Sequence, residues 1–221
     1  KKDTIYLYKT ALYPLQAMMD AMFSNDIDDV FVTSAYRRYD KQKQLFDGYV
    51  EKLMNKGMSY DKAYAEVLKD TALPGQSEHQ TGLCIDFMTL SMDELDNTFE
   101  DTKAFKWLKD NAWKYGFVLR YPEDKVSITG YSYESWHYRF VGLEVASIMY
   151  QTGLCYEEYL EYLKVYISPD DKQVTNTERG RARKFSSLCS LYRYLYKHKY
   201  ISQNPSVFVD KPKLHDKAII R

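Results

Sequence analysis

The chain has 221 residues, of which 45% are hydrophobic and 28% charged, with nine glycines and six prolines, a composition that excludes collagen-like and disordered proteins. Its formal net charge of +0 hides an asymmetry, because residues 172–221 carry 12 Lys+Arg against 3 Asp+Glu and leave an acidic body. We therefore expect a catalytic or binding body over residues 1–168 and a basic helical tail over residues 169–221.

Helix and strand patterns alternate along the body. Apolar residues at spacings of three and four predict a helix after Pro14 that ends near Ser24. Further helices are expected over residues 40–57, 59–69, 101–115, 142–153 and 157–166. Strands are expected over residues 30–36, 83–90 and 117–121, and a hairpin over residues 125–141 that turns at Thr129-Gly130. The mixture predicts an α+β fold with a small antiparallel sheet and flanking helices.

Two of the four histidines lie close to acidic residues. His79 is in the turn-rich segment SEHQTGLCID, seven residues before Asp86, and His137 is three residues after Glu134. Two imidazoles and one carboxylate form a common ligand set for catalytic zinc, which leaves the fourth position for water. The spacing thus indicates a zinc site of His79, Asp86 and His137, with Glu134 as the group that takes a proton from water.

Spacing alone leaves this a minority interpretation. A histidine next to an acid is more often a surface or core residue than a metal ligand. Asp86 lies in the apolar run of residues 83–90, where a buried carboxylate needs a partner. That partner could be a metal ion or an arginine.

The ExxH spacing carries a geometric condition. Residues three apart point to opposite faces of an ideal strand, so Glu134 and His137 need a strand end, bulge or turn to share one face. We expect Trp136 and Tyr138, which alternate with His137, to face away from the metal and into the core.

Arg37 and Arg38 follow the first expected strand. They are either solvated or salt-bridged charges, or one of them reaches the cleft and stabilises an oxyanion. Position alone does not decide between these alternatives.

Three segments together resemble a known family. SAYRRYDKQ, PGQSEHQTGLCIDF and ITGYSYESWHYRFVG, in this order, resemble the signatures of the VanY and VanXY-type zinc D,D-carboxypeptidases and D,D-dipeptidases. The resemblance covers about residues 5–165. It implies an α+β domain with a zinc cleft above an antiparallel sheet. It also implies removal of C-terminal D-Ala from peptidoglycan stem peptides, or hydrolysis of D-Ala-D-Ala, which in resistant bacteria removes the target of vancomycin.

The resemblance assigns roles to residues that match its motifs. It implies that Zn²⁺ is held by His79, Asp86 and His137, that Glu134 is the catalytic base and that Arg37, rather than Arg38, steadies the substrate carbonyl. It also implies that the substrate cleft is lined by Ser34, Gln42 and Ser77.

Two positions depart from the family pattern. Ser135 stands where the family usually has proline, and Cys84 where a small residue such as alanine is common. Substrate length is expected to depend on cleft-capping residues within 48–73. A body that binds peptidoglycan without cutting it is the alternative function.

The basic tail needs a separate interpretation. Residues 175–215 resemble part of the N-terminal DNA-binding domain of tyrosine recombinases, without the catalytic part, and we interpret them as a fused remnant. Nucleic acid is therefore not expected as a partner, except through the basic tail. If the tail does bind nucleic acid, the chain would be a nucleic-acid-binding adaptor, a second alternative function. No run of about 18 apolar residues predicts a membrane segment. We expect a cytoplasmic protein if it is VanXY-like, and a cell-envelope protein if a signal or anchor has been removed.

Overall fold

The computed structural model describes residues 5–162 and Lys197. Its sheet has four strands in the spatial order β1-β2-β4-β3, and each neighbouring pair is antiparallel. The strands are β1 (Val30–Ser34), β2 (Cys84–Thr89), β3 (Phe117–Tyr121) and β4 (Glu134–Phe140). The predicted α+β class is confirmed. The predicted boundary near residue 168 and the basic tail, apart from Lys197, lie outside the described residues.

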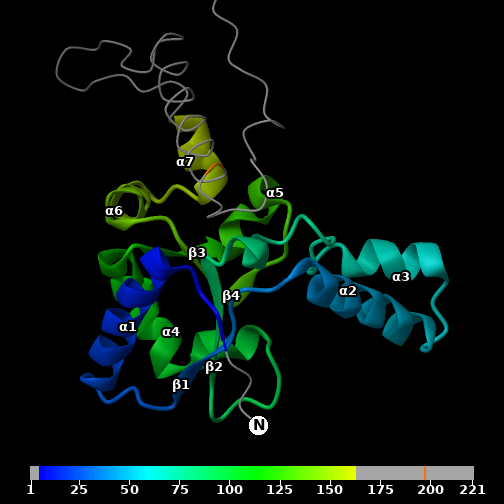
Figure 1. Cartoon of the computed structure of the whole chain (residues 1–221), viewed down its shortest axis with the longest axis horizontal. Helices are drawn as coiled ribbons and strands as arrows, with labels where there is room; N and C mark the ends of the chain where they lie inside the picture. Colours follow the sequence, from blue (N-terminus) through cyan, green and yellow to red (C-terminus); the bar gives the residue numbers. More distant parts are fainter. Residues whose placement is uncertain (1–4, 163–196, 198–221) are drawn as a thin grey trace, which may run out of the picture. The chain divides into compact units, whose positions relative to one another are not determined.

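The helices between Lys9 and Thr152 flank this sheet (Figure 1). The α-helices are α1 (Lys9–Phe23), α2 (Tyr39–Met54), α3 (Tyr60–Val67), α4 (Lys103–Asn111), α5 (Val126–Thr129), α6 (Leu143–Thr152) and α7 (Tyr156–Tyr162). Short 3₁₀ helices are η1 (Glu78–Thr81), η2 (Asn97–Asp101), η3 (Ala112–Tyr115) and η4 (Glu123–Lys125). Among the residues that the structure describes, no helix is long and apolar enough to cross a membrane.

Two predicted elements differ from the structure. Helix α1 begins at Lys9 and contains Pro14, whose missing N–H costs a single backbone hydrogen bond near the start of the helix. The predicted hairpin at Thr129-Gly130 is wrong, because Val126–Thr129 forms one helical turn. The Glu134–Phe140 strand pairs instead with Phe117–Tyr121 on one side and with Cys84–Thr89 on the other.

The two faces of the sheet have different surroundings. Ile85, Phe87 and Tyr138 are almost fully buried in the main core, on which α1 and α4 also pack. Because successive strand residues point to opposite faces, Asp86 and His137 face the other way. The hydrophobic core therefore holds one face of β2 and β4 in place while the other face carries the polar residues.

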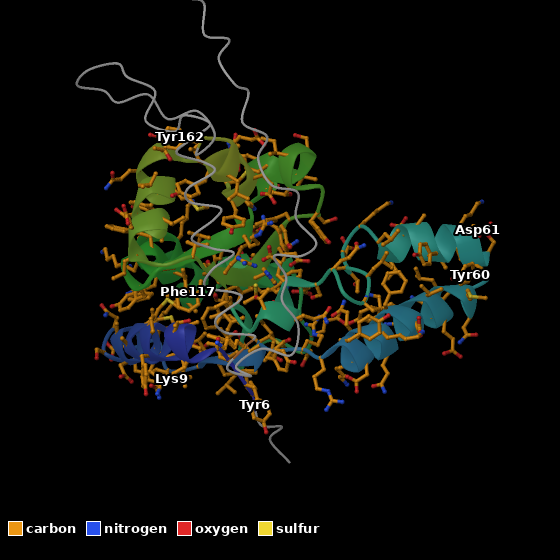
Figure 2. The ribbon with its side chains drawn as sticks, turned by 45° about the horizontal axis from the view of Figure 1, so that its top comes forward. Tyr6, Lys9, Tyr60, Asp61, Phe117 and Tyr162 are labelled. Atoms are coloured by element: carbon orange, nitrogen blue, oxygen red, sulfur yellow. The ribbon has the colours of Figure 1, made fainter. Side chains whose placement is uncertain are left out.

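Helices α2 and α3 lie side by side as a helical hairpin to one side of the sheet (Figure 1). Their facing sides share a second apolar cluster of Phe46, Val50, Ala63 and Val67. Tyr60 and Asp61 mark the end of this hairpin that is farthest from the sheet (Figure 2). The segment expected to cap the cleft, residues 48–73, is thus largely helical.

Gly82 makes the turn that joins η1 to β2. Its φ is +66°, a left-handed conformation that side chains disfavour, and its carbonyl accepts a hydrogen bond from the N–H of Tyr8 at 2.8 Å. A Cβ at this position would lie 3.3 Å from the Tyr8 nitrogen. The turn brings His79, before it, next to Asp86, after it.

We predict that Gly82→Ala lowers the free energy of unfolding by about 1–2 kcal/mol, the cost of a left-handed alanine. The matched control is Gly48→Ala, in the interior of α2 with no atom within 4 Å of the added Cβ. That change should raise stability by about 0.5–1 kcal/mol through helix propensity. Urea denaturation of both variants measures the two effects, and equal shifts would contradict the assignment.

Candidate active site

Antiparallel pairing of β2 with β4 sets Asp86 directly opposite His137. The Asp86 carboxylate lies 2.9 Å from Nδ1 of His137 and 3.2 Å from Nε2 of His79. All three side chains are buried. Although burial alone would raise the pKa of Asp86, the two histidines hold it below its ordinary value, so the carboxylate is ionised.

His79 is oriented by a backbone carbonyl. Its Nδ1 lies 2.6 Å from the carbonyl oxygen of Ala35. Since a carbonyl can only accept, Nδ1 donates this hydrogen bond, and Nε2 faces Asp86. Such hydrogen bonds to the outer nitrogen are how proteins orient histidines that bind metals.

The donor atoms of His79, Asp86 and His137 all lie within 4.8 Å of one another. Two nitrogens and one carboxylate oxygen suit Zn²⁺ with a fourth position left open. Zinc ligands must be deprotonated. Asp86 is already ionised, but its hydrogen bond raises the pKa of His137, so a bound zinc ion would displace the proton of that imidazole. The three residues therefore fit a zinc ion.

A second group of donors shares His137. Glu78, Cys84 and His137 also approach within 4.8 Å. The Glu78 carboxylate, however, is 2.8 Å from Arg120 and 3.1 Å from Arg139. Two guanidinium groups satisfy that carboxylate and repel a cation, so this group is the weaker metal site. Glu78 lies 3.8 Å from Nε2 of His137, beyond hydrogen-bonding distance.

Glu134 reaches the same side of the sheet as His137 through a strand irregularity. The pairing of β3 with β4 passes from Tyr121–Glu134 to Leu119–Tyr138, so β4 has two extra residues there. Of the strand end, bulge or turn that the ExxH spacing allowed, the structure has a bulge. Burial raises the pKa of Glu134 to about 7. A carboxylate with a pKa near neutrality can take up a proton and release it again.

The bulge also corrects the expectation for Trp136. Tyr138 is buried in the core as predicted, but Trp136 lines the cleft with one side while it packs against the core with the other. Strict alternation fails here, where the pairing of β4 with β3 is irregular.

The structure separates the two arginines. Arg37 lines the cleft, and its guanidinium bonds Ser34 Oγ at 2.8 Å and Gln42 Oε1 at 2.9 Å and lies 3.4 Å from Asp86. Arg38 points to solvent and pairs with Asp40 at 2.8 Å. Of the two arginines, Arg37 is thus the one that lies in the cleft. Ser34 and Gln42, expected to line the cleft, both hold Arg37 in place.

The site lies in a cleft of about 510 Å³ that continues along the helical hairpin. Of the expected substrate residues, Ser77 and Gln42 line it, whereas Ser34 is not among its lining residues. The sequence did not indicate Tyr121 and Tyr131, whose stacked rings line the cleft with centroids 4.8 Å apart. Glu78 was also missed, although it is adjacent to His79 and could have been suspected from that position.

A family model described as VanY, D-alanyl-D-alanine carboxypeptidase, matches residues 4–143, which contain every residue of this site. The chain belongs to the VanY family. Over 146 residues it is 41% identical to the D-alanyl-D-alanine carboxypeptidase of Enterococcus faecalis strain V583. That alignment covers 66% of this chain and 52% of the relative, so the chain spans about half the length of that curated VanY-family protein.

Solved structures share the fold. A zinc-bound mutant of the vancomycin-resistance D,D-pentapeptidase VanY superposes with a TM-score of 0.62 at 38% identity, covering 70% of this chain and 83% of that one. A VanYB structure with the same score holds D-alanine-D-alanine. The LD-carboxypeptidase LdcB superposes with a TM-score of 0.63 at 38% identity, covering 73% of this chain and 72% of that one.

We predict that Asp86→Asn weakens zinc binding by more than about 100-fold, beyond the loss caused by removing an outer partner of a ligand. Asp40→Asn changes the same chemistry at an exposed position and should leave zinc affinity unchanged. Calorimetric zinc titration of the metal-free proteins makes the comparison. Equal affinity of the two variants would rule out Asp86 as a ligand.

Proposed function

We propose that this chain is a zinc D,D-carboxypeptidase that removes the terminal D-Ala from peptides ending in D-Ala-D-Ala. The observation that carries the proposal is the convergence of His79, Asp86 and His137 beside Glu134 and Arg37 in one cleft. We assign the metal to the first three residues, proton transfer to Glu134 and oxyanion stabilisation to Arg37.

The residues divide the reaction between them. Zinc supplies a Lewis acid that polarises the scissile carbonyl and lowers the pKa of water. Glu134 takes the proton of the attacking water and passes it to the leaving amine of D-Ala. Arg37, held rigid by Ser34 and Gln42, places its positive charge where the carbonyl oxygen becomes an anion. Burial of the site strengthens these interactions, because little water screens them.

The structural neighbours include both D,D- and LD-carboxypeptidases. We favour the D,D reaction because the family model and the matched Enterococcus protein carry that description. Such an activity would remove the target of vancomycin. A peptide ending in D-Ala-D-Ala and its shortened form with one D-Ala, assayed side by side, distinguish the two reactions, and cleavage of the shortened form alone would replace the D,D assignment.

Glu134→Gln tests the assigned base. It keeps the shape of the side chain but cannot take up a proton, so we predict that kcat falls by about 10²–10⁴-fold while zinc is retained. Glu144→Gln, an exposed glutamate on α6, is the matched control and should keep the full rate. The measurement is D-Ala release by zinc-loaded protein. A chelator should abolish the wild-type activity, and excess zinc should restore it.

Two results would reject this proposal. Full activity of Glu134→Gln would remove the assigned base. Zinc bound at one ion per chain with no D-Ala release from any of these peptides would favour the alternative, a protein that binds peptidoglycan without cutting it.

The cleft is longer than a dipeptide needs. Gln42 and Lys52 both line it from α2, and ten helical residues span about 15 Å, against about 7 Å for an extended dipeptide. Tyr49 lies between them and also lines the cleft. We therefore propose a stem peptide, rather than free D-Ala-D-Ala, as the preferred substrate.

For Tyr49→Ala we predict a fall of about three- to tenfold in kcat/KM for a pentapeptide, the loss expected for one partly buried ring. Hydrolysis of D-Ala-D-Ala should not change, because the dipeptide does not reach this residue. Tyr60→Ala, at the far end of the hairpin, is the control. Steady-state kinetics with both substrates measure the two effects. An equal loss of kcat/KM for the dipeptide would contradict the proposal that the substrate extends along α2 to Tyr49.

A further inference from the structure

One side chain holds the backbone on both sides of Glu134. Nδ2 of Asn97 donates to the carbonyl oxygen of Tyr133 at 3.0 Å, and Oδ1 of Asn97 accepts from the N–H of Ser135 at 2.9 Å. The donor and the acceptor each meet the only kind of partner they can use, which fixes the orientation of the amide.

Glu134 depends on its backbone for position. The nearest ionic partner of its carboxylate among the described residues is Nδ1 of His137 at 3.6 Å, which is longer than a hydrogen bond. No side chain of residues 5–162 holds this carboxylate by a hydrogen bond in the structure. Its place in the cleft is therefore set by the course of residues 133–135.

Regular sheet pairing is interrupted beside this segment, although Glu134 itself still pairs with Tyr121. The ladder between β2 and β4 stops at Asp86–His137, and the ladder between β3 and β4 is interrupted between Leu119 and Tyr121. The N–H of Ser135 goes to Asn97 instead. Asn97 thus forms hydrogen bonds with the backbone of Tyr133 and Ser135 where regular strand pairing is interrupted.

Asn97 is itself on a well-anchored element. It is the first residue of η2, whose N-cap residue Asp96 accepts the N–H of Thr98 at 2.9 Å. Phe99, two residues on, is fully buried in the core. Glu100 adds a further link to the same segment, because it accepts a 2.8 Å hydrogen bond from the hydroxyl of Tyr133.

We propose that Asn97 is a positioning residue that sets the place of the Glu134 carboxylate in the cleft. This inference rests on the proposed function, because it acts through the assigned base. A displacement of about 1 Å at a reacting group can cost about 100-fold in rate. Asn97 should therefore affect the chemical step through Glu134, without touching substrate or metal.

The test is a double-mutant cycle between Asn97→Ala and Glu134→Ala, with D-Ala release from a peptide ending in D-Ala-D-Ala as the readout. We expect Asn97→Ala alone to lower kcat by about 10–100-fold, with KM and zinc affinity changed by less than about threefold. In the Glu134→Ala background the same change should cost nothing further, because the group it positions is gone. Asn111→Ala is the matched control, since it removes an asparagine bond to the carbonyl of Trp107 elsewhere.

Amide hydrogen exchange of Ser135 gives a readout that does not require activity. Exchange at Ser135 should accelerate in Asn97→Ala and stay unchanged in Asn111→Ala. Asn97→Asp retains the acceptor for Ser135 and loses the donor to Tyr133, so it should keep the Ser135 protection and lose part of the rate. If Asn97→Ala does not fold, Asn97→Asp enters the same cycle.

Three results would overturn the inference: an unchanged kcat in the Asn97 variants, an equal loss with and without Glu134, or unchanged Ser135 exchange in a folded Asn97→Ala. An inactive wild-type protein with zinc bound would instead reject the proposed function. In that case the exchange of Ser135 still decides whether Asn97 holds the segment.

Discussion

The register of β2 against β4 is the constraint on which the site depends. It places Asp86 opposite His137, and directly opposed residues in an antiparallel pair have Cβ atoms only about 5 Å apart. The next residues along each strand, Phe87 and Tyr138, are fixed in the core. A slip of one residue would exchange the two faces and bury the wrong side chains. Hydrophobic packing on one face thus sets the geometry of the ligands on the other.

The other residues of the site, His79, Glu134 and Arg37, lie in turns, bulges or strand ends rather than within regular strands. Gly82 turns the chain so that His79 meets Asp86, and the bulge in β4 turns Glu134 toward His137. Arg37 follows the end of β1 and is held by neighbours on both sides. Each irregular segment is stabilised by hydrogen bonds from outside the sheet, which keeps the site rigid without lengthening the strands.

The order of the three motifs, rather than spacing alone, led to the assignment of the ligands, the base and the arginine, and the structure brings these residues together in one cleft. Spacing also required a strand end, bulge or turn between Glu134 and His137. It could not reveal Asn97, whose partners are 36 and 38 residues away. Ser135 stands where the family usually has proline, and its N–H makes the bond to Asn97 that a proline could not form. The hairpin predicted at Thr129-Gly130 was wrong because a glycine with positive φ is as common at a helix end as in a tight turn. Gly130, with φ +75°, ends the helix Val126–Thr129.

Two donor groups share His137, so the location of the metal is the most direct test of this account. An anomalous difference map at the zinc edge, from crystals of the zinc-loaded protein, distinguishes them. We predict one peak about 2.0–2.2 Å from His79 Nε2, an Asp86 oxygen and His137 Nδ1. A peak between Glu78, Cys84 and His137 Nε2, or no peak at either group, would contradict the assignment.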